Sequence, residues 1–135
     1  METKVQQKPQ NISTQELAKA TIEGISDKKG QKITQLNLTH LNEAACDYFI
    51  ICQGNSTTHA KAIANNVIYH LKKEWGEYPM SFEGMKNAEW ILIDYASVVV
   101  HVFVKEKRTF YQLEDLWSDA VVTNYDEDGS KLTDE

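Results

Sequence analysis

The chain has 135 residues, of which 41% are hydrophobic, 25% charged and 10% aromatic. This length suits one domain, and an apolar content near the globular average excludes a chain that is disordered throughout. No apolar run approaches the ~18 residues that a membrane span needs, and the first ten residues lack the apolar segment of a secretory signal. Two cysteines are too few to staple a small secreted scaffold. A cytoplasmic protein with reduced thiols, not bound to a membrane, is predicted.

The net charge of −6 is concentrated at the carboxy-terminal end. Residues 1–113 hold 13 basic and 12 acidic residues, whereas residues 114–135 hold one basic and 8 acidic residues. A body this close to neutral offers no general counter-charge to a phosphate backbone, which argues against nucleic acid as the partner and predicts no sequence-specific binding to it. We expect one domain over residues 13–120, a disordered tail over residues 1–12 and an acidic, disordered tail over residues 121–135.

Two helices are predicted from their end signals. The first starts at Ser13-Thr14-Gln15-Glu16, which has the form of a capping box, and stops at Lys28-Lys29-Gly30. The second is capped by Ser56 or Thr57, carries an apolar stripe at helical spacing and stops at Gly76.

The strands are predicted from alternation and from short apolar runs. Between and after the two helices we expect, in chain order, a half-covered strand at Lys32–Leu38, a strand buried on both faces at Cys46–Cys52, a short strand at Met80–Glu83, a hairpin of Trp90–Asp94 with Val98–Val104, and a last helix at Lys105–Trp117. The order α-β-β-α-β-β-β-α specifies an α/β or α+β sandwich, in which helices pack on a mixed β-sheet.

Metal binding and nucleophilic catalysis have weak candidates. His40, His59, His70 and His101 include no pair at i, i+4 on a helix, and a zinc site needs closer pairs than these. Cys46 and Cys52, six residues apart, are expected on the same face of their strand but not close together. Ser56 lacks the second glycine of a nucleophile elbow and is interpreted as a helix cap.

Phosphate handling is the best enzymatic candidate. A strand that ends in Gly54-Asn55-Ser56 before a helix points backbone amides toward an anion. Nucleotidyltransferases use such an opening together with two carboxylates, one residue apart, that hold magnesium. Here Asp94 stands alone. A nucleotidyltransferase-like or phosphate-binding enzyme therefore stays as the alternative function.

The segment Phe82–Tyr95 is the most suggestive surface. It places Glu83, Glu89 and Asp94 beside aromatic side chains that include Trp90. Aromatic anchors surrounded by charge of one sign are typical of a binding site for an oppositely charged, here basic, protein. The alternative is that Trp90 belongs to the core and that the acids are merely solvated.

Four motifs in order resemble the ribosomal silencing factor family, RsfS, also called Iojap. They are Asp47–Ser56 (DYFIICQGNS), Glu83-Gly84 before Glu89–Tyr95 (EWILIDY), Val98–Phe103 (VVVHVF) and Arg108–Trp117 (RTFYQLEDLW). The resemblance covers about Leu17 to Ala120. It implies a nucleotidyltransferase-like α/β domain that lacks the catalytic carboxylate pair, and hence a protein that is no enzyme and has no metal or cofactor.

The resemblance also implies a function. Family members bind the large ribosomal subunit through the ribosomal protein uL14, block its joining with the small subunit and lower translation when nutrients are scarce; organelle relatives assist large-subunit assembly. Carried over by motif, the partner-binding residues are Glu83, Gly84, Trp90, Asp94, Tyr95, His101, Arg108 and Tyr111. A homodimer of the free protein is also expected. Ala96-Ser97 departs from the family, whose members often carry Gly-Asp at this turn.

Overall fold

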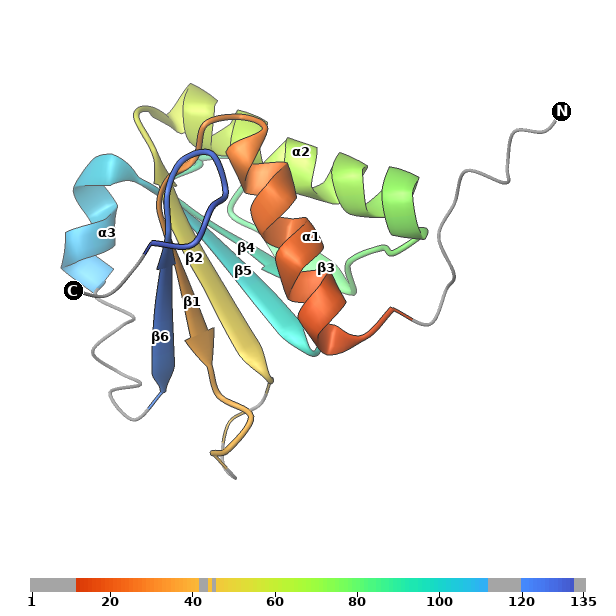
Figure 1. The fold of residues 1–135 in the computed structure, drawn as a ribbon. Helices are drawn as coiled ribbons and strands as arrows, with labels where there is room; N and C mark the ends of the chain where they lie inside the picture. The colour runs from red at the N-terminus through yellow and green to blue at the C-terminus, as the bar shows by residue number, and fades with distance from the viewer. Residues whose placement is uncertain (1–11, 42–43, 45, 112–119, 133–135) are drawn as a thin grey trace, which may run out of the picture.

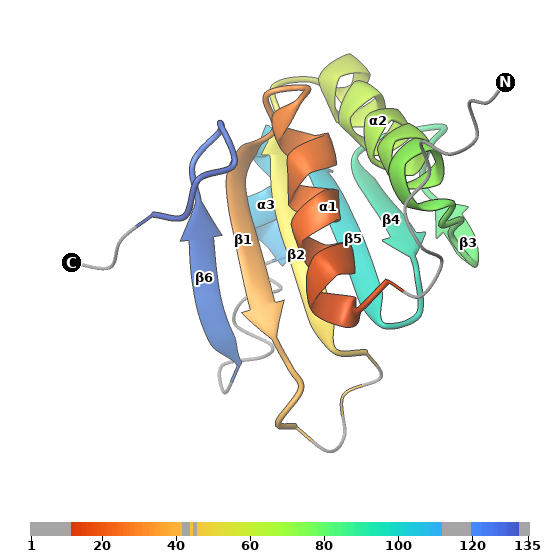
Figure 2. The same ribbon diagram turned by 45° about the vertical axis from the view of Figure 1, so that its right-hand side comes forward.

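A six-stranded mixed sheet forms the centre of the protein, with helices on both faces. The computed structural model describes residues 12–41, 44, 46–111 and 120–132. The elements are α1 (Thr14–Ser26), β1 (Gln31–Asn37), β2 (Tyr48–Gly54), α2 (Thr57–Trp75), β3 (Ser81–Glu83), β4 (Trp90–Asp94), β5 (Val98–Val104), α3 (Lys105–Tyr111) and β6 (Val121–Tyr125) (Figure 1). Figure 2 shows α1 and α2 in front of the sheet and α3 behind it. The predicted fold class, a mixed sheet with flanking helices, is confirmed.

The strand order β3-β4-β5-β2-β1-β6 places β2 and β5 at the centre of the sheet. These two strands run parallel, in a register that pairs Tyr48 with Val98, whereas the other neighbours are antiparallel. A strand that is covered on both faces needs apolar side chains on both, which explains why the two central segments read as near-continuous apolar runs. The predicted bounds of β4 and β5 agree with the structure.

Local capping signals fix the ends of the two long helices. Ser13 Oγ accepts the Glu16 N–H at 3.1 Å and the Ser13 N–H donates to Glu16 Oε1 at 3.2 Å, so the capping box is formed. At α2, Ser56 Oγ accepts the His59 N–H, also at 3.1 Å. Gly76 ends α2 with a left-handed φ of 69°, a conformation that favours glycine. The first two predicted helices are confirmed, and α3 confirms the start of the third at Lys105.

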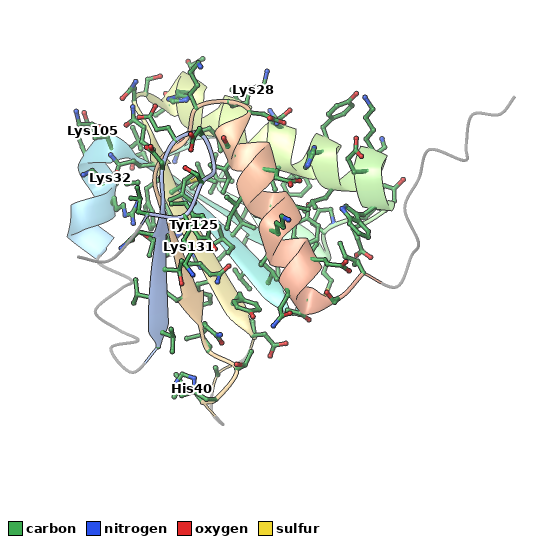
Figure 3. All side chains as sticks on the ribbon, viewed as in Figure 1. Lys28, Lys32, His40, Lys105, Tyr125 and Lys131 are labelled. Carbon is green, nitrogen blue, oxygen red and sulfur yellow. The ribbon has the colours of Figure 1, made fainter. Side chains whose placement is uncertain are left out.

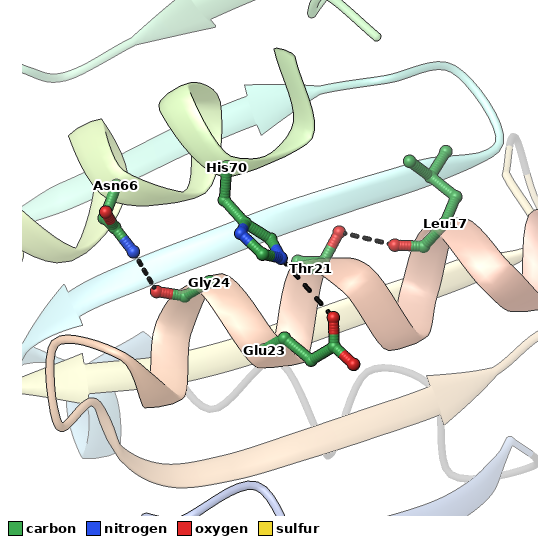
Figure 4. Close-up of polar contacts among 6 residues, drawn as sticks. All are labelled: Leu17, Thr21, Glu23, Gly24, Asn66 and His70. Carbon is green, nitrogen blue, oxygen red and sulfur yellow. Dashed lines mark hydrogen bonds and ion pairs between the residues drawn. The ribbon is translucent and has the colours of Figure 1, made fainter. Parts of the chain in front are cut away.

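Gly24 lets α1 and α2 pack closely against each other (Figure 4). A Cβ atom on Gly24 would lie 3.2 Å from Val67 Cα, which is tighter than ordinary contact. The carbonyl of Gly24, a buried residue of α1, accepts the Asn66 Nδ2–H at 2.8 Å, and His70 Nε2 lies 3.4 Å from Glu23 Oε1. Both polar contacts join α1 to α2 near Gly24. Below them, the two helices and the sheet bury the larger of the two apolar clusters.

β6 was not predicted. The expected disordered tail from residue 121 differs from the structure, because Val121–Tyr125 pairs antiparallel with the free edge of β1. Thr34 Oγ1 lies 3.0 Å from Asn124 Oδ1 across this pair. Three of the acidic residues that suggested a tail, Asp126, Glu127 and Asp128, follow the strand in a turn whose Glu127 carbonyl accepts the Ser26 hydroxyl at 2.7 Å. Residues 1–11, 112–119 and 133–135, and with them part of both predicted tails and the end of the predicted last helix, lie outside the described residues.

The prediction that both cysteines share a face is wrong. Cys52 packs in the cluster under α1 and α2, whereas Cys46 packs with Leu36 and Leu38 on the opposite face. The regular strand begins at Tyr48, so the alternation does not extend back to Cys46. Burial raises the pKa of Cys46 to about 11 and that of Cys52 to about 12, which keeps both as thiols.

Candidate protein-binding surface

The side chains of β4 that point away from α1 and α2 form one half-buried row. Alternation along the strand turns Ile91 and Ile93 into the core under the helices and leaves Trp90, Leu92 and Asp94 on the other face. Their partners in β5 on this face are Phe103, His101 and Val99. Together these side chains form the β4–β5 face, which consists of Trp90, Leu92, Asp94, Val99, His101 and Phe103.

Trp90 and His101 are joined by a side-chain hydrogen bond. The indole Nε1–H donates to His101 Nδ1 at 3.0 Å, and the indole ring stacks on Phe103 with 5.2 Å between ring centroids. Phe49 meets the other side of the imidazole edge-on, at 4.8 Å between centroids. Burial lowers the pKa of His101 to about 4, so the ring is neutral near pH 7 and Nδ1 accepts. Trp90 is thus half-buried and held in one orientation, so it is not a fully buried core residue.

Two carboxylates lie near one edge of the β4–β5 face. Asp94 Oδ1 accepts the Ala96 N–H at 2.7 Å in the hairpin turn, where Ala96 has a φ of 74°. Glu83 pairs with Leu92, so it shares the face of Leu92, and its side chain is exposed. Neighbouring residues on paired strands share a face. The acids therefore flank the half-buried apolar row.

Gly84 contributes through its backbone. Its φ is 89°, and a Cβ atom on it would lie 2.1 Å from the carbonyl oxygen of Trp90. A side chain is excluded there both by the contact and by the left-handed conformation. The Gly84 carbonyl accepts the Ala88 N–H at 2.8 Å, closing the turn that leads into β4. Gly84 therefore allows β3 to approach the chain at Trp90.

Tyr95 and Arg108 do not belong to the β4–β5 face. Tyr95 is 7% exposed and packs in the cluster under α1 and α2, where burial raises the pKa of its phenol. The Arg108 guanidinium donates to the Lys32 carbonyl and, at 3.0 Å, to Thr34 Oγ1. It is buried beside an open groove between β1, β6 and α3, around which Figure 3 shows Lys32, Lys105 and Tyr125. The side chain of Tyr111 lies outside the described residues.

A groove of about 390 Å³ opens on the β4–β5 face. Sequence reasoning missed several residues of its apolar wall, although alternation from Trp90 and Asp94 points to Leu92 between them. Met80, 73% exposed, lines the groove, a position that its sequence neighbourhood does not indicate. The lining residues are Leu38, Cys46, Phe49, Met80, Leu92, Asp94, Ala96, Val99 and His101.

The Gly54–Ser56 turn serves the start of α2. The Asn55 N–H donates to His59 Nδ1 at 2.9 Å, and His59 Nε2 lies 2.7 Å from the carbonyl of Lys28. A Cβ atom on Gly54 would lie 2.8 Å from the backbone nitrogen of Ala60, so the glycine permits close packing of strand and helix. The features that suggested a phosphate site thus have structural roles.

The described residues contain neither a cluster of metal ligands nor a helix that could span a membrane. No three His, Cys, Asp or Glu side chains lie close enough together to hold a metal ion, within the part of the chain that the structure describes. In that same part, no helix combines the length and apolar character of a membrane span.

Comparison with known proteins gives consistent matches. The family described as "ribosomal silencing factor during starvation" matches residues 11–135. The ribosomal silencing factor RsfS of Halalkalibacterium halodurans is 40% identical over 109 residues, which cover 81% of this chain and 92% of that protein. A mouse protein named "mitochondrial assembly of ribosomal large subunit protein 1" is 36% identical over 75 residues, 53% of this chain and 32% of its own length. A crystal structure of a Chromobacterium violaceum protein has a TM-score of 0.74 at 36% identity, covering 78% of this chain and 87% of that one.

Proposed function

Because the chain belongs to the ribosomal silencing factor family, we propose that it binds the large ribosomal subunit in the cytoplasm through ribosomal protein uL14. Bound there, it blocks association with the small subunit and represses translation under nutrient limitation. The observation that carries this proposal is the β4–β5 face, where Trp90 is half-buried and fixed in orientation, and where Asp94 and the neighbouring Glu83 add negative charge around Leu92. Rigid aromatic anchors are the residues most often found to dominate protein-protein binding.

The charge distribution supports a protein partner. Asp94 belongs to the β4–β5 face and Glu83 lies beside it, whereas the chain up to residue 113 is close to neutral overall. Local negative charge complements a basic protein surface, and it disfavours direct contact with RNA phosphates. A single interface of this kind is enough for the mechanism, because a small rigid domain at the subunit boundary excludes the other subunit sterically.

Co-sedimentation with purified ribosomal subunits tests the proposal. We expect the wild-type chain to migrate with large subunits and to reduce the yield of 70S particles when small subunits are added. Asp94→Lys and Glu83→Lys are expected to weaken binding, whereas Asp27→Lys, an exposed charge reversal at the end of α1, serves as the matched control. Migration with small subunits alone, or equal binding by all three variants, would contradict the proposal.

A role in large-subunit assembly is the second candidate, because the name of the mouse relative states that function. The two roles differ in the particles that accumulate when the protein is absent. Loss of an assembly factor produces large-subunit precursors during growth, whereas loss of a silencing factor raises the 70S fraction during starvation. Sucrose-gradient profiles of a deletion strain under both conditions separate them.

A further inference from the structure

The position of the imidazole hydrogen of His101 follows from its partner. An indole N–H can donate but cannot accept, so His101 Nδ1 must be the acceptor of the 3.0 Å bond from Trp90. A neutral imidazole carries one hydrogen, which is then on Nε2. Burial, which lowers the pKa of His101 to about 4, keeps the ring in this neutral form. His101 Nε2 is therefore a hydrogen-bond donor.

This donor is buried without an acceptor. His101 is 4% exposed, and its Nε2 has no hydrogen-bond partner among the residues that the structure describes. Buried polar groups are nearly always paired, so an unpaired donor needs a reason. His101 also lines the groove on the β4–β5 face. Because His101 lies at the groove while its Nε2 is covered, a ligand that enters the groove and displaces the covering side chains can supply the missing acceptor.

The groove restricts what that acceptor can be. Of the described residues that line it, Asp94 alone carries a full charge, and its carboxylate repels an anionic acceptor. Asp94 Oδ1 already accepts the Ala96 N–H, which leaves acceptor capacity on the second oxygen. Asp94 and His101 are diagonal neighbours on paired strands, and such neighbours lie roughly 7–8 Å apart. One short segment that offers both an acceptor and a donor can therefore contact both residues.

We propose that His101 is the specificity-determining donor of this groove and that it takes the carbonyl oxygen of an amide group from a protein partner. An amide N–H of the same segment donates to Asp94, and apolar atoms beside it pack on Leu92 and Val99. This inference rests on the proposed function, in which the partner is uL14. Because Nε2 has no exposed surface in the free chain, neighbouring side chains must shift to admit the carbonyl. Met80, unbranched and largely exposed on the groove, is suited to such a shift.

Two substitutions distinguish the role of His101 Nδ1 from that of Nε2. In His101→Asn the side-chain oxygen replaces Nδ1 as the acceptor for Trp90, but no donor reaches the place of Nε2. In His101→Gln the longer side chain brings an amide N–H to the place of Nε2 and gives up the contact with Trp90. We expect His101→Asn to weaken binding to purified uL14 about tenfold, and His101→Gln to stay within roughly threefold of wild type because it keeps the donor. The opposite order would assign His101 the positioning of Trp90 alone and would overturn the proposal.

Nuclear magnetic resonance on the wild-type chain needs no substitution. In the free chain at pH 7 the imidazole ¹⁵N spectrum should show hydrogen on Nε2, and addition of uL14 should shift that resonance and slow exchange of its hydrogen with water. Hydrogen on Nδ1, or an unchanged Nε2 resonance when uL14 is bound, overturns the role of His101 and leaves the proposed function standing. Wild-type chain that binds neither uL14 nor large subunits overturns both.

Discussion

The hydrogen bond between Trp90 and His101 should contribute measurably to folding stability. Trp90→Phe keeps an aromatic ring against Phe103 but removes the indole N–H, so His101 retains a buried nitrogen without a donor. A buried polar group left unpaired costs about 1–3 kcal/mol. For a chain of 135 residues, each 1 kcal/mol corresponds to roughly 3–5 °C in the thermal midpoint. Trp90→Phe alone, however, also removes ring volume.

A double-mutant cycle isolates the bond from this loss of volume. Urea unfolding at pH 7, followed by circular dichroism, is measured for wild type, Trp90→Phe, His101→Leu and the double variant. We expect a coupling free energy of about 1–2 kcal/mol, because the second substitution removes the polar group that the first leaves unpaired. Trp90→Phe combined with Ser13→Ala is the control, since Ser13 lies at the start of α1 and contacts neither residue. Additivity within about 0.5 kcal/mol in the Trp90–His101 cycle would refute the bond as a stabilising contact.

The remaining predictions concern pH, backbone and assembly. The pKa of His101 is lowered from 6.5 to about 4 in the folded state, so the stability that neutral His101 contributes is complete above pH 6.5 and is lost as pH falls toward 4. Urea titrations should show a loss of about 3 kcal/mol over this range in wild type, and His101→Gln should lack that loss. Gly84→Ala, with its Cβ against the Trp90 carbonyl, should lower the free energy of unfolding by at least about 2 kcal/mol, and a variant as stable as wild type would contradict the backbone geometry. Ser56→Ala should cost about 1 kcal/mol in thermal unfolding through loss of the α2 cap, whereas Ser56→Thr should cost less. A homodimer formed through an exposed sheet edge should appear in light scattering at high concentration, and a monomer throughout would exclude it.

Signals that act over a few residues were readable from the sequence. Ser13 and Ser56 mark helix starts because their hydroxyls cap nearby amides, and Gly76 marks an end because it adopts a left-handed conformation. Alternation also places Trp90 and Asp94 together on one face of β4. The same alternation turns Tyr95, the residue after Asp94, toward the opposite face of the sheet. The predicted site includes Tyr95 because it belongs to the family motif, although the alternation argues against it.

Contacts between distant segments were not readable. Arg108 donates to the carbonyl of Lys32, which is 76 positions away in the sequence, and no local sequence pattern predicts such a partner. β6 was missed because the acidic composition around it outweighed its short run of β-formers, and because its pairing is decided by the open edge of β1. The bond from Trp90 to His101 depends on the register of the β4–β5 hairpin, which the turn at Tyr95–Ser97 sets through its backbone conformation.

The pairing of β6 with β1 has a consequence for how the chain is made. Thr34 and its contact Asn124 are 90 residues apart, so β1 is synthesised long before the strand that covers it. At typical translation speeds of 5–20 residues per second, that interval lasts roughly 5–20 s. During this time the nascent chain presents an unpaired strand, the kind of surface that recruits other strands and promotes misassembly. The sheet that the structure describes is therefore complete only once β6 has been made, and chains shortened to lack β6 should aggregate more readily than the chain that contains it.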